Sequence, residues 1–181
     1  MAEFQYELRI PKDRIAVLIG KKGDVKRQVE ESTKTKLEID SKEGDVFIKG
    51  EDALGLFTAR EVIKSIGRGF NPEVALLLLK PDYAYEAISL NDFIKGSKNS
   101  LVRIKGRIIG KEGKARAVIE ELTETYITVY GKTIGIIGLA ENATMARRAV
   151  ESLISGSKHA NVYKWLEKKR RDLKEAEMTN L

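Results

Sequence analysis

An internal repeat constrains the fold of this chain more than any other feature of the sequence. The segment Ile19–Gly23, IGKKG, recurs as Ile109–Gly113, IGKEG, at an offset of 90 residues. The agreement continues over about fifty positions with one two-residue shortening, which is too long for chance and indicates a duplicated domain. The matched positions include Val29, Thr33 and Thr35 with Ile119, Thr123 and Thr125, and further on Arg60, Val62 and Ile66 with Arg148, Val150 and Ile154.

Both copies contain the same order of predicted elements. Alternating residues predict a strand over 4–10, which Pro11 ends, and Asp13 is expected to cap a short helix that reaches Leu18. A glycine pair separates this helix from a second one, which carries Val25 and Val29 on its apolar face. The rest of the first copy is expected to form short strands over 37–39 and 46–48, joined by a turn at 43–45, and a helix over 53–66. The second copy is expected to have a strand over 83–90, a helix over 99–108, a long helix over 142–154 and a terminal helix over 163–177.

The order strand–helix–helix–strand–strand–helix predicts the fold class. We expect an α+β protein with two tandem domains, each a three-stranded antiparallel sheet backed by three helices, followed by a C-terminal helix. A chain of 181 residues is long enough for each domain to bury its own core. The expected boundaries are 1–72 for the first domain, 73–157 for the second, and 158–181 for a basic helix and tail.

Composition excludes several classes of protein. The chain has no cysteine, so disulfides and thiolate metal sites are excluded, which fits the reducing cytoplasm where we expect the protein. Its longest apolar run, Val74–Leu79, is too short to span a membrane, and no membrane association is expected. The formal net charge is +6, and residues 81–181 hold most of the excess, with 18 basic and 13 acidic side chains. A basic second half is compatible with a nucleic-acid partner.

The repeated Gly-x-x-Gly loop has the chemistry of a phosphate-binding turn. Glycines let a nucleic-acid backbone approach without meeting Cβ atoms, and the following helix offers unpaired N–H groups and the positive end of its dipole. An isolated motif of this kind is usually only a turn, but two copies at equivalent places favour a binding loop. An apolar groove beside such a loop can take about four unstacked bases. The groove floor is expected to include Ile19, Val29, Leu37 and Ile39, and in the second copy Ile109, Ile119, Ile127 and Val129, unless these residues belong to the core.

Basic residues gather around both loops. Eight of them lie from Lys95 to Arg116, where only Glu112 opposes them, so we expect the second loop to dominate nucleic-acid affinity. A solvated helix face would have the same pattern. Glu112 would repel a phosphate unless it points away or pairs with Arg116. Replacing Gly110 or Gly113 by Asp is expected to weaken binding while the fold survives. The candidate binding residues are Gly20, Lys21, Lys22, Gly23, Lys26 and Arg27, and Arg103, Lys105, Arg107, Gly110, Lys111, Gly113, Lys114 and Arg116.

The two copies resemble type I KH domains through the segments IGKKG and IGKEG. They depart from the usual KH pattern in having Lys26 and Arg116 where an aliphatic residue is common, and Lys34 and Glu124 where glycine is common. The second copy is more specifically similar to the Dim-two (partner-of-Nob) family of small-subunit ribosome-assembly proteins. The segments that carry this resemblance are 106–114 (GRIIGKEGK), 145–149 (MARRA) and 153–157 (LISGS), followed by Val162 and Tyr163.

This resemblance covers nearly the whole chain and implies a function. The implied ligand is single-stranded RNA, in the 3′ region of small-subunit rRNA during ribosome assembly. The implied protein partners are the PIN-domain endonuclease that trims this rRNA end and the translation-initiation machinery. The chain lacks the long N-terminal extension of eukaryotic members, so an archaeal form is expected. The first loop is degenerate in eukaryotic relatives, whereas Gly20 and Gly23 are both present here, so RNA binding by the first domain stays open.

Neither catalysis nor a cofactor or metal is expected. The segment Gly106–Glu112 has the wrong spacing for a P-loop, and no Ser/His/Asp or Cys/His arrangement is present. The acidic residues are scattered, whereas metal-dependent nucleases cluster them, and His159, the only histidine, is expected at the surface. One alternative function stays open: a protein-interaction scaffold in ribosome assembly or translation initiation that binds RNA weakly. The run Lys168–Arg171 is either a solvated helix face or a further contact with rRNA or a partner protein.

Overall fold

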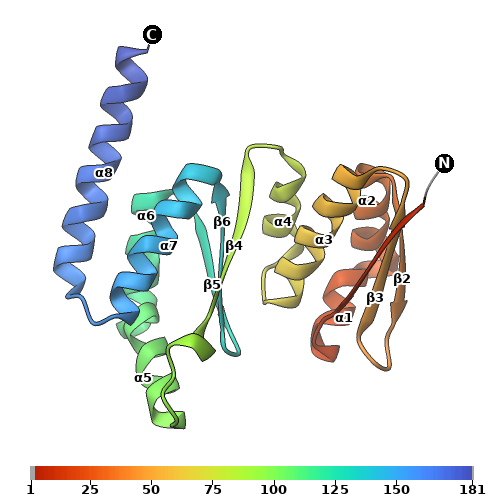
Figure 1. Ribbon diagram of the computed structural model, residues 1–181, viewed down its shortest axis with the longest axis horizontal. Helices are drawn as coiled ribbons and strands as arrows, with labels where there is room; N and C mark the ends of the chain where they lie inside the picture. The colour runs from red at the N-terminus through yellow and green to blue at the C-terminus, as the bar shows by residue number, and fades with distance from the viewer. Residues whose placement is uncertain (1–2, 181) are drawn as a thin grey trace. The chain divides into compact units, whose positions relative to one another are not determined.

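The computed structural model describes residues 3–180, which form two compact units (Figure 1). The chain passes from the first unit to the second between Tyr85 and Glu86. Met1 and Ala2 of the expected first domain, and Leu181 of the expected tail, lie outside the described residues. Within residues 3–180, no helix combines the length and the apolar character needed to cross a membrane.

The first unit is a three-stranded antiparallel sheet with helices packed on one face (Figure 1). The strand order is β1-β3-β2, so β2 lies at an edge of the sheet. Leu37, Val46 and Ile48 point from the sheet into the buried core beneath the helices. The elements are β1 (Phe4–Arg9), α1 (Lys12–Ile19), η1 (Lys21–Gly23), α2 (Asp24–Thr33), β2 (Thr35–Asp40), β3 (Asp45–Gly50), α3 (Ala53–Gly67), α4 (Pro72–Ala75) and η2 (Leu76–Leu79).

The second unit repeats this arrangement. Its strand order is β4-β6-β5, which places β5 at a sheet edge as β2 is in the first unit. Ile108, Ile119 and Ile136 meet in a fully buried core between the helices and the sheet. The elements are β4 (Tyr83–Ser89), whose first three residues precede the division between the units, η3 (Leu90–Asp92), α5 (Lys98–Ile109), η4 (Lys111–Gly113), α6 (Lys114–Thr123), β5 (Tyr126–Tyr130), β6 (Thr133–Leu139), α7 (Ala140–Ile154) and α8 (His159–Thr179).

The predicted α+β fold class is confirmed in both units. Two details differ from the expectation. Pro11, not Asp13, is the N-cap residue of α1. Asp13 lies in the first turn of α1, where its carboxylate interacts favourably with the positive end of the helix dipole. The expected domain boundary at 72/73 falls before the division seen in the structure, because α4 and η2 pack against α3 and so lie with the first unit.

Several residues shared by the two repeats form a hydrogen-bonded corner where the second helix of each unit meets the next strand. In the first unit the Thr33 hydroxyl donates to the carbonyl oxygen of Val29 at 2.6 Å and lies 2.7 Å from the Thr35 hydroxyl. The carboxylate of Glu30 accepts the backbone N–H of Leu37, on the edge strand, at 2.8 Å. These contacts join α2 to β2 without using any residue of the glycine loop. The second unit makes the same bonds, at 2.6 to 2.7 Å, with Thr123, Ile119, Thr125, Glu120 and Ile127.

The terminal helix α8 belongs to the core of the second unit. It starts at His159, before the expected start at 163, and it packs against α6 and α7. Val162 and Leu166 are buried in the core cluster, and Trp165 packs against it. An end of the second domain at 157, as expected from the sequence, therefore leaves out part of its apolar core.

Tyr85 gives the first unit a late titration step. Burial raises the pKa of Tyr85 to about 12, and its ring packs edge-on against Phe70 with 6.2 Å between ring centroids. The unfolded chain releases this proton near pH 10, so the stability of the fold decreases as the pH rises from about 10 towards about 12. Tyrosinate absorbance should therefore show a step near pH 12 that is missing in Tyr85→Phe. A wild-type curve with no late step would contradict this prediction.

Candidate nucleic-acid interface

The two Gly-x-x-Gly loops have nearly the same backbone. Each carries three residues with positive φ, namely both glycines and the residue before the second glycine. The loop thus bends twice into the left-handed region before the next helix begins, which strongly favours glycine at its ends. The φ values are 75°, 54° and 75° for Gly20, Lys22 and Gly23, and 74°, 56° and 75° for Gly110, Glu112 and Gly113.

The two glycines of a loop are required for different reasons. A Cβ atom on Gly110 would lie 2.7 Å from the backbone nitrogen of Ala115, so this glycine allows close contact between the loop and α6. A Cβ atom on Gly113 would meet no heavy atom within 4 Å, so Gly113 faces open space. Only Gly113 therefore offers a bare backbone to a ligand. The first loop has the same pattern, with Gly20 crowded by Asp24 and Val25 and Gly23 in open space.

The apolar residues expected on the groove floor divide between core and surface. Ile119 and Ile127 are buried and belong to the core of the second unit. Ile109 and Val129 are half-buried, so they keep a solvent-accessible side that can contact a base. The first unit divides in the same way, with Val29 and Leu37 buried and Ile19 and Ile39 half-buried.

Five basic candidates of the second loop region are accessible and unpaired. Lys111 lies in the loop, Lys114 occupies the first position of α6, and Arg116 follows in its first turn; all three are exposed. On α5, Arg103 is exposed and Lys105 is half-buried. Within residues 3–180, none of these five side chains forms an ion pair. Their charge is therefore available to phosphate groups.

Arg107 has a structural role that the sequence did not suggest. Its Nε atom donates to the carbonyl oxygen of Leu153 at 3.0 Å, and its Nη2 atom donates to that of Ser157 at 2.6 Å. The backbone oxygen of Arg107 in turn lies 2.8 Å from Nε2 of His159, at the start of α8. The guanidinium thus binds one carbonyl in the last turn of α7 and one just after its end, and so ties α5 to this part of the chain. Because its guanidinium already donates to two carbonyl oxygens, Arg107 is less available to a phosphate than Arg103.

Arg14 has the equivalent role in the first unit. Its Nε and Nη2 atoms donate to the carbonyl oxygens of Ile66 and Phe70, at the end of α3, at 2.8 and 2.9 Å. Arg14 and Arg107 do not correspond at the offset of 90, so comparison of the two repeats could not identify this shared contact.

Arg107 and Arg103 should respond differently to the same substitution. Arg107→Gln is expected to lower the free energy of unfolding by about 1–3 kcal/mol, because two charge-assisted hydrogen bonds to carbonyls are lost. Arg103→Gln, on the same helix, removes only an exposed charge and should change stability little. Urea denaturation measures both. A smaller loss of stability for Arg107→Gln than for Arg103→Gln would contradict the structural role.

Glu112 does not pair with Arg116. The carboxylate is exposed, and within residues 3–180 it forms no ion pair. Lys22 occupies the matching position of the first loop, where its carbonyl oxygen accepts a hydrogen bond from Nη2 of Arg27 at 3.2 Å. Arg27 thus stabilises the first loop, and the second loop has no such brace among the hydrogen bonds of residues 3–180.

The starts of the two loop helices carry opposite charges. Asp24 opens α2, and its Oδ1 atom accepts the backbone N–H of Val25 at 2.7 Å. Lys114 opens α6 at the matching position of the repeat. In the first loop Lys21 and Lys22 are exposed, whereas Lys26 is half-buried. The sequence contained this signal, since Asp24 aligns with Lys114 at the offset of 90, but charge counting over longer segments obscured it.

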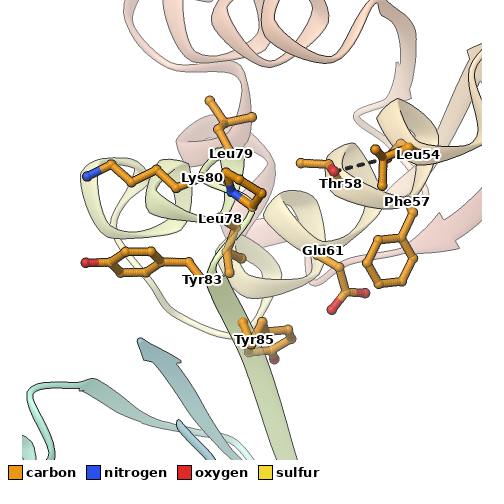
Figure 2. Close-up of a pocket in the computed structure, with 11 residues that line it drawn as sticks. Leu54, Phe57, Thr58, Glu61, Leu78, Leu79, Lys80, Tyr83 and Tyr85 are labelled. Atoms are coloured by element: carbon orange, nitrogen blue, oxygen red, sulfur yellow. Dashed lines mark hydrogen bonds between the residues drawn. The ribbon is translucent and has the colours of Figure 1, made fainter. Parts of the chain in front are cut away.

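Within residues 3–180, no group of three or more His, Cys, Asp or Glu side chains could hold a metal ion. The first unit contains a pocket of about 300 Å³ away from its glycine loop, shown in Figure 2. Leu54, Phe57, Leu78 and Tyr83 line it, with Glu61 and Lys80 among its few charged groups. This apolar hollow does not fit a phosphate backbone.

Comparison with protein families matches both units to KH domains. Residues 5–65 match the family described as "KH domain", and residues 84–171 match "Eukaryotic type KH-domain (KH-domain type I)". A KH domain-containing protein of Methanocaldococcus jannaschii is 49% identical over 173 residues, covering 93% of this chain and 75% of that protein. A chain in the crystal structure of the a/eIF2alpha-aDim2p-rRNA complex from Pyrococcus horikoshii OT3 superposes with a TM-score of 0.86 at 45% identity, covering 94% of this chain and 96% of that chain. The chain belongs to the Dim2/PNO1 family of KH proteins.

The expected resemblance to the Dim-two (partner-of-Nob) family is thereby confirmed. The Dim2/PNO1 family also includes eukaryotic members. The pre-rRNA-processing protein PNO1 of Chaetomium thermophilum is 33% identical over 105 residues, which cover 57% of this chain and 40% of that protein. The match to this fungal Dim2/PNO1 protein therefore spans less than half of its length.

Proposed function

We propose that this protein binds single-stranded RNA through the second Gly-x-x-Gly loop, in the 3′ region of small-subunit rRNA during ribosome assembly. The observation that carries the proposal is the solvent-facing Gly113 directly before α6, with Lys111 and Lys114 exposed beside it. The Pyrococcus family member was crystallised in a complex with rRNA, and the fungal member is named a pre-rRNA-processing protein. Both names support an rRNA ligand for this chain.

The chemistry of the second loop suits a phosphate group followed by unstacked bases. The first N–H groups of α6 have no partner within the helix and carry its positive dipole end. Lys114 adds a full positive charge at that helix end. The exposed sides of Ile109 and Val129 can accept bases, while Arg103, Lys105 and Arg116 extend the positive surface. Lys21, Lys22, Lys26 and Arg27, with Gly20 and Gly23, are proposed as a weaker second site.

We also propose the PIN-domain rRNA-maturation endonuclease and the translation-initiation machinery as protein partners, with the cytoplasm as the place of action. The Pyrococcus complex supports the second partner, since it contains a/eIF2alpha. This chain is proposed to act by binding, with cleavage left to the endonuclease. A scaffold with weak RNA binding is the alternative that the experiment below separates from this proposal.

Filter binding with the full chain tests the proposal. The probes are a labelled RNA from the 3′ end of small-subunit rRNA and a scrambled RNA of the same composition. The logarithm of the affinity should fall linearly with the logarithm of salt concentration, by a slope of ~0.7 for each phosphate contact. The native RNA should bind more tightly than the scrambled one. Absent or salt-insensitive binding would support the scaffold alternative, and equal affinities would contradict the rRNA assignment alone.

A further inference from the structure

The two glycine loops form a matched pair that differs mainly in where the charged side chains stand. Their φ values agree within 2° at the three left-handed positions, and both are followed directly by a helix of 10 residues. The backbone therefore cannot explain a difference in phosphate binding between them. The side chains around the start of the helix can, because Asp24 stands in the first unit where Lys114 stands in the second.

The Asp24 carboxylate lies at the start of α2, beside the N–H groups that would otherwise be free to bind a phosphate. Its Oδ1 atom accepts the N–H of Val25 at 2.7 Å, so it already uses one of the free donors at the helix start. The same oxygen lies over Gly20, in the space that a Cβ atom there would fill. In the second loop the atoms nearest to the corresponding space, over Gly110, belong to Ala115 and carry no charge.

A carboxylate in this position opposes RNA in two ways. It competes with phosphate for the backbone donor of Val25, and it places a negative charge within a few ångströms of the approaching phosphate. The exposed cations Lys21 and Lys22 only partly compensate, because they lie in the loop and not at the helix start. The positive end of the helix dipole attracts the carboxylate and so holds it at the start of α2.

We infer that Asp24 is an internal anion that blocks the phosphate position of the first loop and so directs RNA to the second loop. This inference rests on the proposed function, since it presumes that the second loop binds RNA. It makes Asp24 a specificity-determining residue: the first loop has the backbone of an RNA-binding loop and is closed by one side chain.

The test removes the acidic side chain from the first loop in a chain whose second loop carries a substitution that weakens RNA binding. In the full chain carrying Gly113→Asp, Asp24→Lys is added and binding of the 3′ rRNA probe is measured by filter titration. The expected result is about a tenfold or greater recovery of affinity, on the order of one new charge-assisted contact. Asp24→Asn, which removes the charge with little change of shape, should give a smaller recovery. Crosslinked RNA should map to the segment 20–27 in the Asp24→Lys chain and not in its parent.

Glu31→Lys is the matched control, because Glu31 is an exposed acid on the same helix, away from the loop. It makes the same change in net charge. If Glu31→Lys recovers as much affinity as Asp24→Lys, or if Asp24→Lys recovers none while its helix content is unchanged, the inference is wrong and the proposed function still stands. If Gly113→Asp alone binds RNA like the wild type, the second loop is not the binding site, and the proposed function fails independently of Asp24.

Discussion

Replacing Gly113 by Asp is expected to lower the affinity for single-stranded RNA at least about tenfold, which corresponds to about 1.4 kcal/mol of binding free energy. The second unit is expected to stay folded. The new carboxylate would project into the open space at the start of α6, where a phosphate is proposed to bind. Asp is among the side chains that best tolerate a left-handed backbone, and the conformational cost is about 1–2 kcal/mol. Filter binding measures the affinity, and circular dichroism checks the helix content.

Two matched variants separate charge from strain in this experiment. Gly113→Ala imposes the same left-handed φ without a charge, so it should retain much more RNA affinity than Gly113→Asp. Gly23→Asp makes the same change in the first loop, where Asp24 is already present, and should lower affinity less. An equal loss for Gly23→Asp and Gly113→Asp would contradict the proposed dominance of the second loop.

Gly110→Asp is no longer a clean test of RNA binding. From the sequence alone the two glycines of the loop are equivalent, so Gly110→Asp and Gly113→Asp are both predicted to leave the fold intact. A Cβ atom at Gly110 would lie 2.7 Å from the backbone nitrogen of Ala115, so the loop or α6 would have to move. Any loss of RNA binding in that variant would combine a damaged loop with an added charge.

Leu166→Ala is expected to lower the free energy of unfolding of the second unit by about 2–5 kcal/mol. Leu166 is fully buried on α8, where it packs into the core formed with α6 and α7. Its truncation would leave a cavity that rigid neighbours fill only in part. Trp165, the single tryptophan of the chain, is adjacent and half-buried, so its fluorescence during urea denaturation reports on this unit.

Lys164→Ala is the control for Leu166→Ala. Lys164 is exposed on the same helix, and its removal should change the unfolding midpoint little. The two compact units can unfold in separate steps, so the tryptophan signal must be compared with the far-ultraviolet circular dichroism of the whole chain. Equal midpoints for the two variants would show that α8 is not part of the core.

The fold could be predicted well from the sequence because each helix and strand of the domain occurs twice, so two separate sequence segments indicate each element. Alternation and turn residues placed β1 and β3 to within about two residues, and the apolar face of Val25 and Val29 identified α2. The predicted domain boundary was wrong because packing, and not local sequence pattern, decides to which unit a short helix belongs. The short helices α4 and η2 contain a leucine run without clear periodicity, and their place in the first unit depends on contact with α3.

The candidate site was predictable in position but not in the role of each side chain. The glycines and the basic residues near them were identified from spacing and charge. That Arg107 serves the end of α7 depends on carbonyls far along the chain, which no local pattern reveals. That Ile119 is core while Ile109 is accessible depends on how the helix turns towards the sheet.

The corner joining the second helix to the edge strand has a consequence for how the two copies can diverge. Thr33, Thr35 and Glu30 fix that corner in the first unit, and none of them belongs to the glycine loop. Mutations at the open positions of a loop, such as Gly23 or Gly113, therefore leave the folding of its unit largely unchanged, so one loop can change while its domain stays folded. After a duplication, such a scaffold lets one copy keep an ancestral ligand while the other drifts towards neutrality or a new partner.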